Sequence, residues 1–123
     1  MSENGSQGII QIADDVVAVI ASLAATKTKG VAGMSGGITE GWAKRVGGKS
    51  ATRGVSVEVG QLEAAIDLRV IVKYGEKIHE VAHQLQRDVK EAVETMTGLN
   101  VVEVNVKVEG VELQEVEEED RVK

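Results

Sequence analysis

The chain has 123 residues, 42% of them hydrophobic and 28% charged, which is the composition of one globular domain and not of a disordered segment. The absence of cysteine excludes disulfides, thiolate zinc sites and cysteine nucleophiles. With one Trp, one Tyr and no Phe, the core must be aliphatic. The amino end lacks the features of a signal peptide, and the longest apolar run is Val16 to Ala21, so we expect a cytoplasmic protein without direct membrane insertion.

The net charge of -6 is unevenly distributed along the chain. The segment from Lys27 to Arg53 holds six basic residues and one acidic residue, which gives it a charge of +5 and leaves -11 for the rest. Such asymmetry is typical of a binding surface, although a glycine-rich loop with solvated basic residues also explains it.

We expect a flexible amino end over 1–6, a single domain over 7–111 and an acidic disordered tail over 112–123. Residues 8–12 are predicted to form a short strand. Asp14 and Asp15 then favour the start of a helix, because carboxylates stabilise the amino end of the helix dipole. Gly30 is predicted to end this helix. The residues expected on the buried face of this helix are Val16, Val17, Ile20, Leu23 and Ala24.

A second short strand is predicted over 31–35, and a long loop follows over 36–54, with a helical turn near 42–46. The loop holds six glycines among 19 residues. A loop of this length inside a small domain is either functional or disordered.

Alternating valines at 55, 57 and 59 and apolar residues from Leu62 to Val72 predict a β-hairpin. A two-residue turn at Gly60-Gln61 would place Val59 opposite Leu62. Tyr74 is expected in the core, and Gly75 ends the second strand.

A long amphipathic helix is predicted from 76 to 97, ended by Gly98. Val102, Val104, Val106 and Val108 then alternate with polar residues and predict a final strand. The elements follow the order β-α-β-loop-β-β-α-β. We therefore predict an α+β, two-layer fold with one mixed sheet of about four or five strands and two helices on one face. The apolar stripe expected along the long helix comprises Ile78, Val81, Ala82, Leu85, Val89, Ala92, Val93 and Met96.

His79, Glu80 and His83 match the H-E-x-x-H pattern, in which two imidazoles one helical turn apart bind zinc and the glutamate activates water. The extended pattern requires a histidine where Val89 stands, and no histidine follows. A solvent-exposed pair of histidines is the simpler interpretation, so we predict no catalytic residue, no metal and no cofactor.

Two glycine patterns offer nucleotide or nucleic-acid alternatives. Gly47-Gly48-Lys49-Ser50 resembles the end of a phosphate-binding loop, but Ala43 replaces the first glycine and the segment leads into a strand. Gly33-Met34-Ser35-Gly36 matches the G-x-x-G of single-strand-binding domains. An acidic chain with almost no aromatic residues is a poor nucleic-acid binder, so this alternative rests on the basic loop 36–54.

The residues predicted to contact a protein partner lie in the basic loop and on the exposed face of the hairpin. Trp and Arg are favoured at interface hot spots, although Trp42 could instead cover the core edge. The predicted set is Trp42, Lys44, Arg45, Lys49, Arg53 and Ile71.

Six segments, in order, resemble the alkaline shock protein family, the general-stress proteins of Gram-positive bacteria, over residues 7–112. They are Gly8-Ile-Ile-Gln-Ile12, Gly30-Val-Ala-Gly-Met34, Gly54-Val-Ser-Val57, Asp67-Leu-Arg-Val-Ile-Val-Lys-Tyr-Gly75, Val93-Glu-Thr-Met-Thr-Gly-Leu99 and Val104-Asn-Val-Lys-Val-Glu-Gly-Val111.

The resemblance implies a small cytoplasmic protein linked to cell-envelope stress, with no established catalytic residues and a tendency to self-associate. Some members of the family gather at the inner membrane face through a membrane-embedded partner. The resemblance therefore favours a non-enzymatic scaffold that binds copies of itself and a small membrane-embedded anchor protein.

Overall fold

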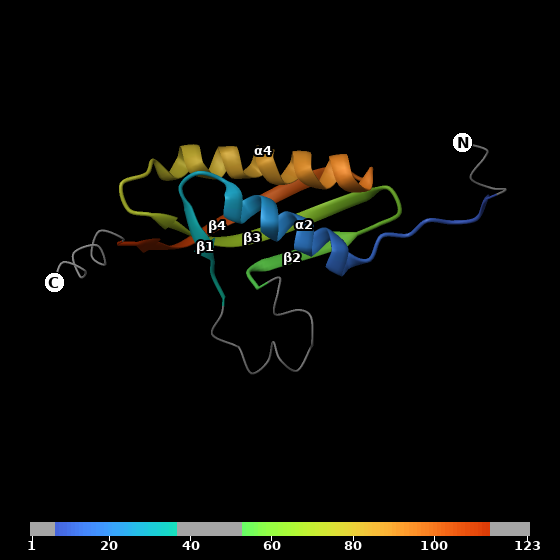
Figure 1. Ribbon diagram of the computed structural model, residues 1–123, viewed down its shortest axis with the longest axis horizontal. Helices are drawn as coiled ribbons and strands as arrows, with labels where there is room; N and C mark the ends of the chain where they lie inside the picture. Colours follow the sequence, from blue (N-terminus) through green and yellow to red (C-terminus); the bar gives the residue numbers. More distant parts are fainter. Residues whose placement is uncertain (1–6, 37–52, 114–123) are drawn as a thin grey trace.

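The computed structural model describes residues 7–36 and 53–113. Four strands form one mixed sheet and two helices cover one of its faces, so the predicted α+β class is confirmed (Figure 1). The elements are α2 (Asp14–Lys27), β1 (Val31–Met34), β2 (Val55–Val59), β3 (Glu63–Lys73), α4 (Ile78–Thr97) and β4 (Asn100–Glu112).

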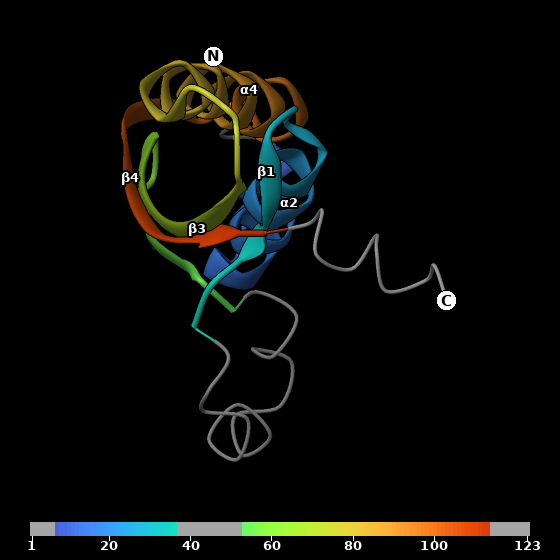
Figure 2. The same ribbon diagram turned by 90° about the vertical axis from the view of Figure 1, so that its left-hand side faces the viewer.

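β3 is the central strand, because each of the other three strands pairs with it. β4 runs parallel to β3 along one side. β2 and β1 run antiparallel to β3 along the other side, β2 beside its first half and β1 beside its second half. The sheet is curved, and Figure 2 shows β4 and β1 rising on either side of β3 toward the helices.

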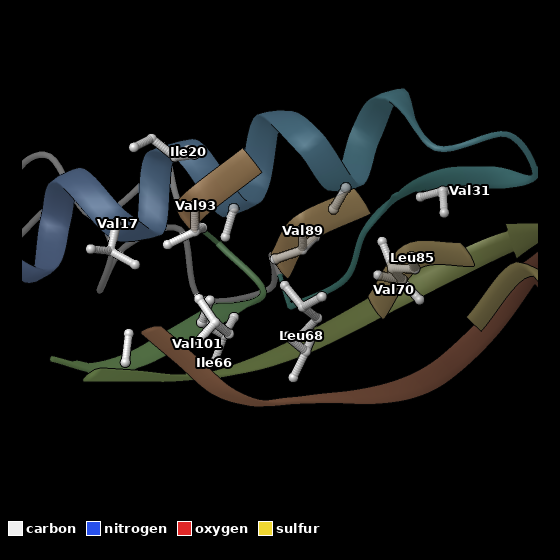
Figure 3. Packing of buried hydrophobic residues seen from close by; sticks show 14 of the residues in the cluster. Val17, Ile20, Val31, Ile66, Leu68, Val70, Leu85, Val89, Val93 and Val101 are labelled. Atoms are coloured by element: carbon white, nitrogen blue, oxygen red, sulfur yellow. The ribbon is translucent and has the colours of Figure 1, made fainter. Parts of the chain in front are cut away.

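The core lies between the helices and the concave face of the sheet, and the buried residues of its cluster in the described ranges are Val, Ile, Leu and Ala, as the composition predicts. Figure 3 shows side chains of β3, such as Leu68 and Val70, on the side of the sheet where α2 and α4 lie. Val89 and Leu85 of α4 are fully buried among them. Burial of this apolar surface is the main favourable term in folding.

The long helix α4 follows its predicted pattern. Val81, Leu85, Val89 and Val93 are buried, and the helix ends at Gly98. Gly98 adopts a φ of 79°, and its N–H donates to the carbonyl oxygen of Glu94 at 2.9 Å. Ile78 and Met96, at the two ends of the predicted stripe, are exposed.

The buried face of α2 differs from the predicted one. Val17 and Ile20 are buried, but Val16 is 47% exposed and Leu23 is 56% exposed. Small residues take their place against the rest of the domain, namely Ala18, Ala21, Ser22 and Ala25. The sequence of α2 is apolar on every side, so its periodicity could not select the buried face.

The predicted strand over residues 8–12 is wrong. Residues 8–13 form no helix or strand, and the side chains of Ile9 and Ile10 are 84% and 90% exposed. Only Ile12 packs against the core. An apolar run becomes a strand only where a neighbouring strand pairs with it, and β3 already has partners along both sides.

The hairpin exists, but its predicted register is wrong by two residues. Val59 pairs with Ala64 instead of Leu62, and Val57 pairs with Ile66. The Gly60 N–H donates to the carbonyl oxygen of Glu63 at 2.8 Å, so the turn is centred on Gln61 and Leu62. A shift of two residues keeps every side chain on its predicted face, so alternation alone could not reveal it.

Two irregularities reset the alternation of β4. Between Val101, which pairs with Ala64, and Glu103, which pairs with Ala65, Val102 is an extra residue. This bulge places Val101 and Val104 in the core and leaves Val102 52% exposed, contrary to the predicted face. A second bulge inserts Glu109 between Val108 and Gly110.

Tyr74 is not a core residue, because it is 65% exposed after the end of β3. Its backbone N–H donates to the carbonyl oxygen of Glu112 at 2.9 Å. This bond extends the contact between the ends of β3 and β4.

Candidate interaction site on the outer face of the sheet

The face of the sheet opposite the helices carries a network of charged side chains. Asp67, Arg69 and Ile71 of β3 alternate with its core residues and so point away from the helices. Asn105 pairs with Asp67 in the parallel register, and its side-chain amide donates to the Asp67 carboxylate at 2.8 Å. In the same register, Lys107 of β4 lies beside Arg69 of β3.

Glu109, the extra residue of the second bulge, is the centre of this network. Its carboxylate accepts hydrogen bonds from the hydroxyl of Ser35 and from Nε of Arg69, the latter at 3.2 Å. Nζ of Lys107 lies 3.8 Å from the same carboxylate. The Ser35 hydroxyl, followed by the Arg69 guanidinium, holds the pKa of Glu109 below its ordinary value.

The two ends of the glycine-rich segment meet beside this network. The backbone N–H of Ser35 donates to the carbonyl oxygen of Arg69 at 2.9 Å, and the Arg69 N–H donates to the carbonyl oxygen of Gly54 at 2.8 Å. β1 and β2 therefore meet at one residue of β3. Gly54 has a φ of +82°, and a Cβ there would lie 2.8 Å from the Ser35 carbonyl oxygen.

Ile71 forms an apolar spot next to Arg69 on the same face. It is half-buried, and its partners on the two neighbouring strands are both glycines, Gly33 in β1 and Gly110 in β4. Because neither glycine has a side chain, the Ile71 side chain has no bulky neighbour at these two positions. The outer face thus offers an apolar centre bordered by charges, a composition that suits protein contacts.

Of the predicted partner-binding residues, Ile71 lies on this outer face and Arg53 lies exposed just before Gly54. The remaining four, Trp42, Lys44, Arg45 and Lys49, lie outside the described residues, as do the predicted helical turn at 42–46 and the phosphate-loop pattern at Gly47. Sequence reasoning missed Ser35 and Glu109, which lie 74 positions apart in the chain.

The histidine pair lies on the exposed side of α4. The rings of His79 and His83 meet edge to face, with centroids 6.4 Å apart, and both residues are exposed. Among the described residues, no group of three or more His, Cys, Asp or Glu could hold a metal ion. A catalytic zinc needs three protein ligands, so the described residues supply no such centre.

The G-x-x-G pattern does not form a clamp-like loop. Gly33 and Met34 belong to β1 and pair with Ile71 and Val70 of β3. Backbone groups that are engaged in a sheet are not available to hold a nucleic-acid backbone. The basic loop remains the basis of the nucleic-acid alternative.

None of the helices in the described ranges is sufficiently long and apolar to cross a membrane.

Residues 2–113 match the alkaline shock protein 23 family, which is described as having a cell envelope-related function. Two relatives from Bacillus subtilis (strain 168) are called uncharacterized. YqhY is 32% identical over 110 residues, which cover 89% of this chain and 82% of the relative. YloU is 39% identical over 106 residues, which cover 85% of this chain and 88% of the relative.

A third relative is a stress response regulator gls24 homolog of Streptococcus pyogenes serotype M1. It is 33% identical over 117 residues, which cover 94% of this chain and 65% of the relative. Among solved structures, the copper form of MamM CTD has a TM-score of 0.51 at 16% identity, and the match covers 82% of this chain and 89% of that one. At this identity the likeness shows the fold alone. The chain belongs to the alkaline shock protein 23 family, a family related to the cell envelope.

Proposed function

We propose that this protein is a non-enzymatic scaffold of the cell-envelope stress response, which associates with itself and with a small membrane-embedded protein at the inner face of the membrane. The family match supports the link to the envelope, and the name of the streptococcal relative supports the link to stress. The fold then serves to present surfaces and not to hold a substrate.

The observation that carries this proposal is that both ends of the basic glycine-rich segment meet at Arg69 of β3, whose side chain lies on the outer face of the sheet. Ser35 and Gly54 meet at Arg69, immediately beside the apolar Ile71. A partner that binds the outer face therefore reaches the basic side chain of Arg69 and the apolar side chain of Ile71 together. Basic and apolar groups side by side suit a partner with an acidic and partly apolar segment.

The test is a crosslinked pull-down from cells that produce the protein, divided into membrane and soluble fractions. We expect the wild-type chain to capture a small membrane protein, and Ile71→Asp and the triple variant Trp42→Ala, Lys44→Ala, Arg45→Ala to lose it. Leu62→Asp is the matched control, because Leu62 is 76% exposed in the turn at the start of β3. Capture that is unchanged in both test variants removes the outer face from the function.

A nucleic-acid module that uses the basic loop is the second candidate, and the charge of +5 between Lys27 and Arg53 favours it. Recovery of RNA in place of a membrane protein, with an affinity that falls steeply with salt, would establish this candidate. A zinc hydrolase that uses His79, Glu80 and His83 is a third candidate, and zinc analysis of the purified protein tests it.

A further inference from the structure

One face of α2 is apolar and uncovered by the described part of the chain. Between Asp15 and Lys27 the helix carries eleven residues without a single charge. Six residues of the helix are buried against the domain, yet Val16, Val19 and Leu23 are 47%, 39% and 56% exposed. A helix that is apolar all round is normally buried on all sides. We therefore expect another protein surface to bury the exposed side of α2.

The exposed side has a defined order of side chains. Asp15, Val19, Leu23 and Lys27 are each four residues apart, so they form one ridge along the helix, and all four are exposed. From the start of the helix to its end, the four side chains of the ridge are acidic, apolar, apolar and basic. At a rise of about 1.5 Å per residue, its two charges lie about 18 Å apart.

This order is complementary to itself when the direction is reversed. If two copies of α2 pack antiparallel about a twofold axis near Ala21, Val19 of each copy meets Leu23 of the other. Asp15 of each copy then meets Lys27 of the other, twice in one interface. A parallel arrangement would instead place acid against acid and base against base.

We propose that the α2 ridge, formed by Asp15, Val19, Leu23 and Lys27, is a self-association surface on which a second copy of this chain packs antiparallel. Interdigitation of two such ridges crosses the helices at about 50°. α2 packs against the core face of the sheet, whereas Arg69 and Ile71 lie on its other face, so a dimer formed through α2 need not cover the outer faces. This proposal rests on the scaffold function for its use in the cell, and it assigns the self-association of that scaffold to one surface.

The first test measures the mass of the purified full chain by sedimentation equilibrium over a range of concentrations. We expect a concentration-dependent dimer, and we expect Leu23→Asp to raise its dissociation constant by more than about tenfold. Leu62→Asp is the control, because it places the same charge on an apolar residue that is 76% exposed and does not belong to α2. Leu23→Ser serves in its place if circular dichroism shows that Leu23→Asp does not fold.

A charge exchange tests the antiparallel arrangement. Asp15→Lys and Lys27→Asp should each weaken the dimer by about tenfold, because each change turns two attractive contacts into repulsive ones. The double variant restores opposite charges at both contacts and should return the dissociation constant close to the wild-type value. Asp15 and Lys27 are too distant within one helix for this rescue to arise inside a single copy.

A chain of 13.0 kDa at every concentration overturns the proposal. A dimer that is equally stable in Leu23→Asp and in the single charge variants also overturns it, and then self-association uses another surface while the scaffold function stands. A monomeric wild type whose Leu23→Asp variant loses a foreign partner in the pull-down assigns the ridge to that partner instead. Conversely, a dimer that depends on Leu23 together with an empty membrane fraction contradicts the scaffold function alone.

Discussion

Ser35, at the end of β1, donates its hydroxyl hydrogen to the carboxylate of Glu109 in β4, although β3 lies between the two strands. The bond crosses the outer face of β3 and joins the two sides of the sheet. Ser35 itself is buried. The bulge that inserts Glu109 into β4 makes this contact possible, because a bulge redirects the side chain of the extra residue. The bulge thus fixes one end of the glycine-rich segment.

The pH dependence of stability should reflect the lowered pKa of Glu109. In the folded state the hydrogen bond from Ser35, followed by that from Arg69, lowers this pKa below the ordinary 4.5, whereas the unfolded carboxyl titrates near that value. Between the two values the unfolded state binds more protons. The stabilisation is therefore present above the unfolded pKa and is lost as the pH falls through the folded pKa.

We expect Glu109→Gln to be less stable than wild type at neutral pH and to lose less of its remaining stability on acidification. Ser35→Ala, which removes the first cause of the shift, should show an intermediate slope. The measurement is the free energy of unfolding in urea from neutral pH down to about pH 3. Identical slopes in all three proteins would show that this contact does not form in solution.

Gly54→Ala should destabilise the domain more than Gly75→Ala. Both glycines have positive φ, which costs other residues about 1–2 kcal/mol. At Gly54 a Cβ would also lie 2.8 Å from the Ser35 carbonyl oxygen and 3.0 Å from that of Arg69, whereas at Gly75 nothing lies within 4 Å. Overpacking adds about 1–3 kcal/mol, so urea unfolding should separate the two variants by at least about 1 kcal/mol. Equal losses would mean that the ends of β1 and β2 do not meet at Arg69.

Leu85→Ala tests the position of α4 on the sheet. Leu85 is fully buried, and truncation of a buried leucine costs about 2–5 kcal/mol. Met96 belongs to the same predicted stripe but is 70% exposed, so Met96→Ala should change the stability by no more than about 0.5 kcal/mol. Thermal unfolding followed by circular dichroism measures both. A large loss in Met96→Ala would show that this end of α4 is covered by a partner or by another part of the chain.

The sequence correctly predicts the buried side of those elements whose apolar residues lie on one side only. The helix α4 has one apolar side, and its residues Val81, Leu85, Val89 and Val93 are buried as expected. The alternation of β3 places Ile66, Leu68 and Val70 in the core. The pattern of α2 does not identify one buried side, because apolar residues stand on every side. Contact with α4, β1 and β2 decides which side is buried.

The candidate site depends on features with little local signature. The register of the hairpin differs by two residues from the expected one, and a pattern of period two is identical after that shift. The bulge at Val102 interrupts a regular alternation with no glycine or proline beside it, and at Glu109 the following Gly110 is the single local signal of an extra residue. The Ser35–Glu109 bond spans 74 positions, so only the assembled sheet reveals it.

The last prediction concerns the edge of β4 that faces away from β3. Side chains of α4 cover part of this edge. Gln86 and Lys90 of α4 each donate a side-chain hydrogen bond at 3.0 Å, to the carbonyl oxygens of Val104 and Val101. The carboxylate of Glu94 accepts from the Val101 N–H at 2.8 Å. These three side chains occupy backbone groups that would otherwise be open to pairing with another strand.

Removal of these contacts should make the edge of β4 available for intermolecular pairing. We expect the double variant Lys90→Ala, Glu94→Ala to aggregate faster than wild type, as followed by light scattering during gentle heating. Lys77→Ala, Glu91→Ala removes the same two kinds of charge from exposed positions outside these three contacts, so it controls for altered solubility. Faster aggregation in the first variant alone assigns the effect to the edge, because the net charge of the two variants is the same. Equal aggregation in both would mean that loss of surface charge, and not exposure of β4, governs the behaviour of this protein.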